Sequence, residues 1–225
     1  MNVRRLCMAI PKGALFAGSV RLLRAAGVEI GGLADAGRQL IVDTDGMRFV
    51  IGKPTDIPAY VAYGAADVAI AGADTLVEEA LDVVELVDLR FGACRFVVAE
   101  PEGAAEDAAE HYRRLGVIRV ATKYPRITEA HFAAQGIQIE IVKLHGNIEL
   151  APLIGLADRI VDITATGTTL RENRLRIVED VLESTARFVA NPVSARIDAR
   201  RVMGLADRLA RAASEQEDDE GTGGS

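Results

Sequence analysis

The sequence predicts an α/β protein built from two lobes, and three observations support this fold class. Short apolar runs alternate with helical patterns along the chain, which is typical of strand–helix–strand units around a parallel sheet. Hydrophobic residues make up 49% of the 225 residues and aromatic residues only 4%, so the core has to be aliphatic, as in sheets covered by helices. We place a change of lobe near Phe91–Cys94 and a second crossing near Arg174–Val189.

These crossings divide the chain into lobe I (1–91 with about 176–212), lobe II (92–175) and a tail (213–225). The tail holds five acidic residues and no basic one, so its composition predicts disorder. Without those five charges the net charge of −7 falls to about −2, and the near-neutral body has no basic stripe for nucleic acid. Two lobes leave a cleft between them, where ligands commonly bind.

The elements of lobe I follow from its apolar runs and its turn residues. Apolar runs predict the strands, and the Asp45–Gly46 pair predicts a hairpin. Gly27 and Gly64 end helical patterns, and Thr55 can cap the second of these helices. The expected strands are Leu6–Ile10, Gln39–Asp43, Met47–Ile51, Asp67–Ala71 and Val83–Leu89, and the expected helices are Ala14–Ala26, Thr55–Tyr63 and Asp74–Ala80.

Lobe II repeats the alternation of strands and helices. Asn147 can cap its last helix. An alternating run over Asn173–Val189 returns the chain to lobe I, and an amphipathic helix over Val193–Ala212 closes the fold. The expected strands are Arg95–Ala99, Val117–Thr122, Ile137–Leu144 and Arg159–Thr164, and the expected helices are Ala105–Leu115, Ile127–Gln135 and Asn147–Leu156.

The most informative stretch is Asp162-Ile163-Thr164-Ala165-Thr166-Gly167-Thr168-Thr169-Leu170, in which the loop Ala165–Thr169 lies between a strand and a helix start. Backbone N–H groups converge at such a start, and the threonine hydroxyls add donors for a phosphate. Gly167 lets the backbone approach the anion and can adopt a positive φ. The same composition also occurs in plain turns, so the loop predicts a phosphorylated small molecule as a hypothesis.

Three cations in lobe I could neutralise a pyrophosphate near this loop. Lys12 follows the first strand, at the end of a sheet where α/β proteins bind ligands. Arg38 and Lys53 flank the hairpin and could point into the cleft. The alternative for each is a solvated surface group.

Other candidate side chains concern a flat ring and a ribose. The small residues from Asp67 through Gly72 to Asp74 would let a base lie against the backbone, although close helix–sheet packing explains them equally well. Tyr124, beside a lysine at a strand end, could stack on a base or shield the sheet. Glu149 starts a helix, where a carboxylate is favourable, or faces a ribose.

Several classes of protein are excluded by the pattern. The three histidines have no metal-ligand spacing with cysteines or carboxylates, so we expect no protein-held metal. A Gly-x-Ser-x-Gly nucleophile and a P-loop lysine are both missing. Cys7 and Cys94 lie in apolar runs and indicate reduced thiols in a cytoplasmic protein. The N-terminal apolar run is too short for a signal peptide, and we find no apolar run of membrane-spanning length.

Taken together, these motifs resemble the ATP phosphoribosyltransferase family over roughly Arg5 to Val202. The segment from Glu149 to Leu170 resembles the family signature. Shorter matches occur in the same order along the chain: Ile10–Gly13, Thr55–Tyr60, Tyr63–Asp67, Asp88–Leu89, Cys94–Arg95, Ala121–Pro125 and Lys143–Leu144. The chain stops after the catalytic lobes, so it resembles the short form, without a C-terminal regulatory domain.

The resemblance implies a two-lobed, type II periplasmic-binding-protein-like fold and the first reaction of histidine biosynthesis. In that reaction N1 of the adenine of ATP attacks the anomeric carbon of phosphoribosyl pyrophosphate, and pyrophosphate leaves with inversion. The resemblance also implies Mg²⁺, bound mainly through the substrate pyrophosphate. It implies a homodimer within a hetero-octamer and a regulatory subunit related to histidyl-tRNA synthetase, which mediates histidine feedback.

Site roles follow from the same resemblance. Catalytic contacts to the leaving pyrophosphate fall to Lys12, Arg38 and Lys53. Contacts to phosphoribosyl pyrophosphate fall to the following residues: Glu149, Asp162, Ala165, Thr166, Gly167, Thr168 and Thr169. The adenine is bordered by Asp67, Gly72, Asp74 and Tyr124.

The sequence departs from the family pattern at a few positions. The family usually has arginine in place of Lys53, an acidic residue in place of Ala165, and arginine or asparagine in place of Thr168. Basic residues are common in place of Ala14 and Ala73. These departures keep two alternatives open: a catalytically weakened paralogue, and a small-ligand-binding module of the same fold.

Overall fold

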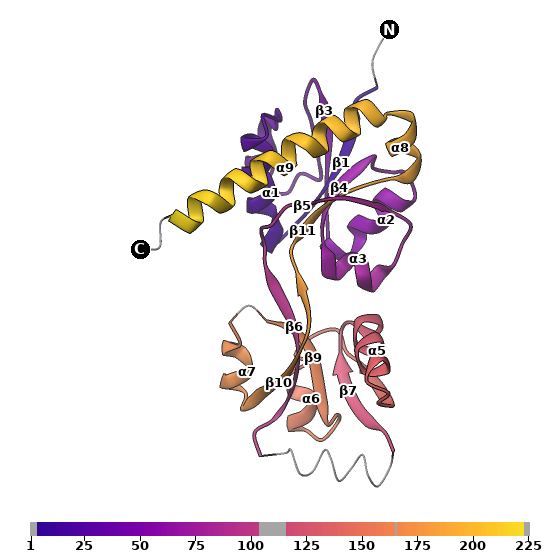
Figure 1. The fold of residues 1–225 in the computed structure, drawn as a ribbon, viewed down its shortest axis with the longest axis vertical. Helices are drawn as coiled ribbons and strands as arrows, with labels where there is room; N and C mark the ends of the chain where they lie inside the picture. Colours follow the sequence, from indigo (N-terminus) through magenta and orange to yellow (C-terminus); the bar gives the residue numbers. More distant parts are fainter. Residues whose placement is uncertain (1–3, 104–115, 165, 223–225) are drawn as a thin grey trace. The chain divides into compact units, whose positions relative to one another are not determined.

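The computed structural model describes residues 4–103, 116–164 and 166–222 (Figure 1), and it describes side-chain surroundings as far as Gln216. The expected helix Ala105–Leu115 and the site candidate Ala165 lie outside the described residues. The chain forms two compact units, unit 1 (Met1–Ala93 with Thr185–Ser225) and unit 2 (Cys94–Ser184). Each unit is described by itself below.

Unit 1 contains a six-stranded sheet in the order β2-β3-β1-β4-β11-β5. The parallel strands β1, β3 and β4 are neighbours, β2 pairs with β3 in an antiparallel hairpin, and β11 is inserted antiparallel between β4 and β5. The strands are β1 (Leu6–Pro11), β2 (Ile41–Asp43), β3 (Met47–Gly52), β4 (Val68–Gly72), β5 (Val84–Asp88) and β11 (Ala186–Ala190). The sheet is therefore mixed, because the strand that returns from unit 2 enters between two strands of the expected parallel order.

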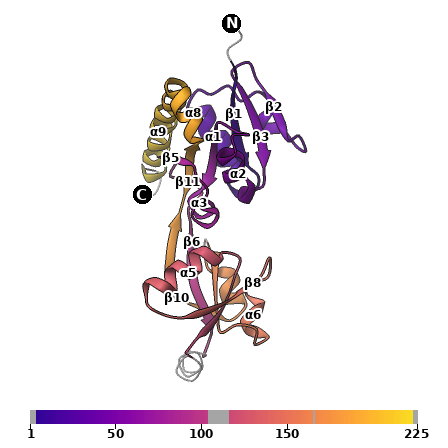
Figure 2. The ribbon, with the colours of Figure 1, turned by 90° about the vertical axis from the view of Figure 1, so that its right-hand side faces the viewer.

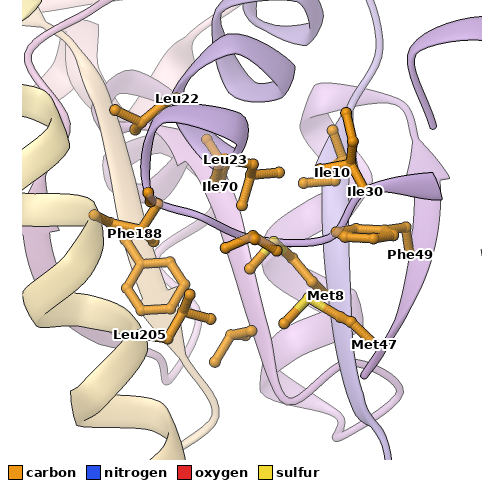
Figure 3. Packing of buried hydrophobic residues seen from close by; sticks show 14 of the residues in the cluster. Met8, Ile10, Leu22, Leu23, Ile30, Met47, Phe49, Ile70, Phe188 and Leu205 are labelled. Carbon is orange, nitrogen blue, oxygen red and sulfur yellow. The ribbon is translucent and has the colours of Figure 1, made fainter. Parts of the chain in front are cut away.

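Helices cover both faces of this sheet (Figure 2). Side chains of α1 and α9 form one aliphatic cluster with Met8, Phe49, Ile70 and Phe188 (Figure 3), and α2 and α3 cover the opposite face. The helical segments of unit 1 are α1 (Ala14–Ala25), η1 (Gly31–Asp35), η2 (Pro54–Asp56), α2 (Ile57–Ala62), α3 (Ala73–Glu79), α8 (Pro192–Ile197) and α9 (Ala199–Thr222).

Unit 2 contains a five-stranded sheet in the order β10-β6-β9-β7-β8. Its parallel strands are β7, β8 and β9, whereas β6 and β10 form an antiparallel pair next to β9. The bounds are β6 (Cys94–Pro101), β7 (Ile118–Thr122), α5 (Pro125–Ala134), β8 (Ile139–Lys143), α6 (Leu150–Leu153), β9 (Arg159–Thr164), α7 (Thr168–Glu172) and β10 (Leu175–Ser184). Helix α5 packs on one face, and α6 and α7 pack on the other.

The structure differs from the expected boundaries at both ends of the second crossing. The expected lobe II ended at residue 175, but β10 pairs with β6 from Leu175 to Ser184, so unit 2 extends to Ser184. The expected tail began at residue 213, but α9 continues to Thr222 and Ala213 is buried in the core of unit 1. The amphipathic helix thus extends into the acidic segment, and residues 223–225 lie outside the described part.

Two expected helix caps are wrong. Helix α2 begins at Ile57 behind a short 3-10 turn, and its N-cap is Asp56 rather than Thr55. Asn147 has a φ of 48°, a left-handed conformation that does not lead directly into a right-handed helix, so α6 begins only at Leu150 and has four residues. The closing helix is divided in two around Asp198, and the side chain of Asn191 caps its first part. No helix in the described residues is long and apolar enough to cross a membrane.

Candidate active site

The Thr166–Thr169 loop follows β9 and includes the first residues of α7, with a left-handed glycine at the turn. Gly167 is the N-cap of α7 with a φ of 71°, and its N–H donates a 2.7 Å hydrogen bond to Oγ1 of Thr164. The hydroxyls of Thr166 and Thr168 lie 3.0 Å apart, and both side chains are exposed. The loop therefore offers hydroxyl groups to a ligand, while the Gly167 N–H is held by the strand that precedes it.

Carboxylates and a cation lie beside this loop. Asp162, on β9, is half-buried, and burial raises the pKa of its carboxyl group. A hydrogen bond from the N–H of Ile163 and the charge of Lys123 lower this pKa, whereas the charge of Glu149 raises it. Because Lys123 and Glu149 both act on Asp162, the structure brings three charged groups from different elements together near the end of β9.

Tyr124 lies in the turn between β7 and α5. Its ring packs edge-on against Phe96 with 4.8 Å between centroids and an interplanar angle of 83°, and the side chain is half-buried. Its N–H donates to Oγ1 of Thr122 at 2.9 Å. The ring is therefore part of the core of unit 2 at the edge where β7 and β9 end.

In unit 1 the structure brings the three predicted cations to one edge of the sheet. Lys12 follows β1 and Lys53 follows β3, and these strands run parallel with Pro11 opposite Gly52. The N–H of Lys12 donates to the carbonyl of Gly52 at 2.8 Å. Both lysine side chains are exposed.

Arg38 reaches the same edge from the loop before β2. It stands two residues before Leu40, whose carbonyl accepts a 2.8 Å hydrogen bond from the N–H of Ile51. Because β2 runs antiparallel to β3, the chain before β2 passes beside the carboxyl end of β3. Arg38 is exposed like the two lysines, so the segments at this edge present three exposed cationic residues.

The third strand of this edge contributes Gly72 and Asp74. Strand β4 runs parallel to β1 and ends at Gly72, and Asp74 lies in the first turn of α3. A Cβ on Gly72 would overlap Oδ1 of Asp74, so the glycine makes room for that carboxylate. The small residue at position 72 therefore has a steric reason.

Asp67, in contrast, is not part of this edge. It precedes β4 at the opposite, amino end of the strand, and it is 3% exposed. Its carboxylate accepts hydrogen bonds from Arg4 (2.7 Å), the N–H of Cys7 (2.9 Å) and the hydroxyl of Ser194 (2.7 Å). We therefore correct the expected contact of Asp67 with the nucleotide: its position and partners give it a structural role.

Metal binding was tested against the donor groups. The described residues hold no cluster of three or more His, Cys, Asp or Glu side chains arranged for a metal ion. The three cations at the edge of unit 1 suit oxyanions rather than a divalent cation.

Two residues beside the loop in unit 2 were assigned no individual role from the sequence. Thr164 accepts the Gly167 N–H, and the Nη2 of Arg171 lies 3.3 Å from Oγ1 of Thr168. The signals that could have found them are spacings: a hydroxyl three residues before the glycine, and a cation one helical turn after it.

These features define a class of protein. Two α/β units, one with a hydroxyl-rich loop beside two carboxylates and one with three cations at a sheet edge, indicate an enzyme that acts on a phosphorylated sugar or nucleotide. A model of the family HisG, ATP phosphoribosyltransferase, matches residues 53–211. The chain belongs to the ATP phosphoribosyltransferase family.

Sequence relatives cover nearly the whole chain. ATP phosphoribosyltransferase of Moorella thermoacetica is 51% identical over 219 residues, which is 96% of either chain. That of Rubrobacter xylanophilus is 46% identical and covers 93% of this chain and 97% of its own.

Solved structures agree with the sequence relatives. A chain of the ATP phosphoribosyl transferase (HisG:HisZ) complex from Thermotoga maritima is 31% identical with a TM-score of 0.78, covering 93% of this chain and 99% of its own. The sulphonate-binding protein SsuA of Escherichia coli has a TM-score of 0.60 at 12% identity, covering 97% of this chain and 76% of its own. The latter likeness shows only the fold, which is of the periplasmic-binding-protein type.

Proposed function

We propose that this enzyme transfers the phosphoribosyl group of phosphoribosyl pyrophosphate to N1 of ATP, releasing pyrophosphate, in the first step of histidine biosynthesis. The observation that carries this proposal is the loop at the end of β9 in a chain of this family. Thr166, Thr168 and Thr169 hold the 5′-phosphate, and Gly167 lets the loop turn at a positive φ.

The remaining contacts follow from the charges at each edge. Asp162 and Glu149 lie beside the loop and accept hydrogen bonds from the ribose hydroxyls. Lys12, Arg38 and Lys53 bind the diphosphate, where negative charge develops as the bond to the anomeric carbon breaks. Gly72 and Asp74 in unit 1, and Tyr124 in unit 2, border the adenine. Catalysis then consists of positioning both substrates and stabilising the leaving group.

Magnesium enters in this scheme with the substrate. Mg²⁺ would be held by the diphosphate of the substrate and would supply positive charge that offsets part of the charge on the leaving group. No step of the proposed mechanism depends on a protein ligand to the metal.

We also propose a regulatory partner in the cytoplasm. The Thermotoga relative was solved as a HisG:HisZ complex, and this chain aligns with 99% of the matched chain. By analogy, a homodimer of this chain assembles with a subunit related to histidyl-tRNA synthetase into a hetero-octamer. Light scattering of the mixed subunits tests the stoichiometry.

The test of the activity is an incubation with ATP, phosphoribosyl pyrophosphate and Mg²⁺, with and without the regulatory subunit. We expect one pyrophosphate released for each modified adenine, and a Lys12→Ala/Lys53→Ala variant that loses most of the turnover. Pyrophosphate release without modified adenine would indicate hydrolysis and overturn the proposal, as would inactivity of both preparations.

A further inference from the structure

We propose that Gly18 and Phe91 are positioning residues for Lys12. Together with Leu15 and Gly92 they form an interlock between α1 and the segment Leu89–Ala93, through which the chain leaves unit 1. The inference deepens the proposed function, because it takes Lys12 as a ligand of the diphosphate.

Helix α1 and Lys12 are joined by a single constrained residue. Gly13 has a φ of 81° and a ψ of −138°, and α1 begins directly after it. On the other side of Lys12, its N–H is bonded to the carbonyl of Gly52. The position of the lysine is therefore set by the sheet on one side and by the start of α1 on the other.

Two glycines make the contact between α1 and the exit segment unusually close. A Cβ on Gly18 would lie 2.5 Å from Cδ2 and 2.6 Å from Cε2 of Phe91. Reciprocally, a Cβ on Gly92 would overlap Cδ2 of Leu15. Each segment thus places a large side chain where the other has no side chain. Glycine is a poor helix former, so its presence inside α1 is explained by this approach.

The exit segment is itself fixed by the segment that returns to unit 1. The carbonyl of Phe91 accepts the N–H of Ala186, and the N–H of Leu89 donates to the carbonyl of Ala186, both at 2.9 Å. Arg90 and Gly92 have φ values of 58° and 68°, in the left-handed region that most residues rarely adopt, so the segment follows an unusual backbone path.

The return segment also holds the other half of the binding edge. The N–H of Ala73 donates to the carbonyl of Thr185 at 3.0 Å, at the start of α3 and next to Gly72. Two of the helices that begin at this edge of unit 1, α1 and α3, therefore contact the crossing segments. A displacement of those segments would move α1 through the Gly18–Phe91 contact, and α1 would in turn move Lys12.

A matched pair of glycine substitutions tests the interlock. Gly18→Ala forces Phe91 to move, whereas Gly204→Ala, also within a helix, places a Cβ where nothing lies within 4 Å. Binding of inorganic pyrophosphate with Mg²⁺ is measured by calorimetry on the whole chain, with circular dichroism to establish folding. We expect Gly18→Ala to weaken binding about tenfold and Gly204→Ala to leave it unchanged, since displacements near 1 Å have effects of this order or larger.

A double-mutant cycle shows whether the effect passes through Lys12. In a Lys12→Met background, Gly18→Ala should cause no further loss of affinity. Phe91→Ala should restore affinity to Gly18→Ala, because alanine lacks the ring atoms Cδ2 and Cε2 that the new methyl group meets. The proposal would be overturned if the double variant lost affinity by the product of the two single-variant losses. Equal affinities for Gly18→Ala and Gly204→Ala would also overturn it. Because binding is measured without turnover, an inactive but pyrophosphate-binding wild type would count against the proposed function only.

Discussion

At the scale of single residues, Gly167 has a conformational reason to be glycine, and a Cβ there would make an ordinary van der Waals contact. Its φ of 71° is rare for other residues, and a Cβ there would lie 3.4 Å from Cδ1 of Ile177. Other glycines of unit 2 have the same φ without the neighbour; Gly155, at 72°, has nothing within 4 Å. The chain thus provides its own control for separating backbone strain from distortion of the loop.

We predict that Gly167→Ala raises the KM for phosphoribosyl pyrophosphate at least about tenfold, the size expected for losing one charge-assisted hydrogen bond to the phosphate. Gly155→Ala should leave this KM unchanged. Both variants should lower the unfolding temperature by a similar amount, because both glycines have a positive φ. Steady-state kinetics with the phosphoribosyl donor varied provides the measurement. If both variants have the same KM, the phosphate does not bind this loop.

The charged carboxylate of Asp162 is expected to lower the free energy of unfolding, although the same group is expected to bind the ribose. Burial raises the pKa of its carboxyl group in the folded state. The native protein then binds more protons than the unfolded chain over the pH range from the unfolded pKa to the folded one. The contribution of Asp162 to the free energy of unfolding therefore falls as pH rises through that range.

For Asp162→Asn we predict a gain in stability that appears with rising pH. The difference in free energy of unfolding between variant and wild type should be small near pH 3, where both states of Asp162 are protonated, and larger at pH 7. Urea titrations at several pH values measure it. Activity should fall about 10–100-fold, because a charged hydrogen bond to the ribose is lost. A stability difference that does not change with pH would contradict the assignment of the raised pKa.

At the scale of elements, a buried carboxylate joins three strands of unit 2. Glu100 of β6 is 1% exposed and accepts hydrogen bonds from Arg159 of β9 at 3.0 Å and from Arg176 of β10 at 2.5 Å. Strand β9 leads directly to the Thr166–Thr169 loop, so this cluster fixes the strand that carries the loop. The two arginines are unequal, with side chains 19% and 46% exposed.

We predict that Glu100→Gln lowers the free energy of unfolding by about 2–3 kcal/mol, below the usual range for a broken buried pair because Arg176 stays partly solvated. Glu183→Gln, an exposed position on β10, should change it by less than about 0.5 kcal/mol. Urea unfolding followed by circular dichroism compares the two. Equal midpoints for both variants would show that the cluster contributes nothing to the stability of the sheet.

At the scale of the whole molecule, local signals predicted the elements and long-range pairing decided their limits. Apolar runs located most of the strands, including β1, β3 and β9, because each run is bounded by turn residues. The end of unit 2 was misplaced, because the pairing of β10 with β6 joins residues about 80 positions apart and leaves no local mark.

The candidate site shows the same division. Lys12 was predicted from its place after a strand and Lys53 from its place beside the hairpin, and the parallel pairing of β1 with β3 brings the two positions side by side. Asp67 was misjudged, because sequence places it near Gly72 while the strand between them separates the two by its whole length. A residue's place before or after a strand therefore says more about its role than its closeness in sequence to a site residue.

The last prediction is made for each unit separately, because different groups of the donor are assigned to each. The 5′-phosphate is assigned to Thr166–Thr169 of unit 2, and the diphosphate to Lys12, Arg38 and Lys53 of unit 1. We expect phosphoribosyl pyrophosphate with Mg²⁺ to slow amide hydrogen exchange in both places, at the loop after β9 and at the turns after β1 and β3. Ribose 5-phosphate, which lacks the diphosphate, should protect only the loop. Protection confined to unit 2 with the complete donor would refute the assignment of the diphosphate to the cationic edge.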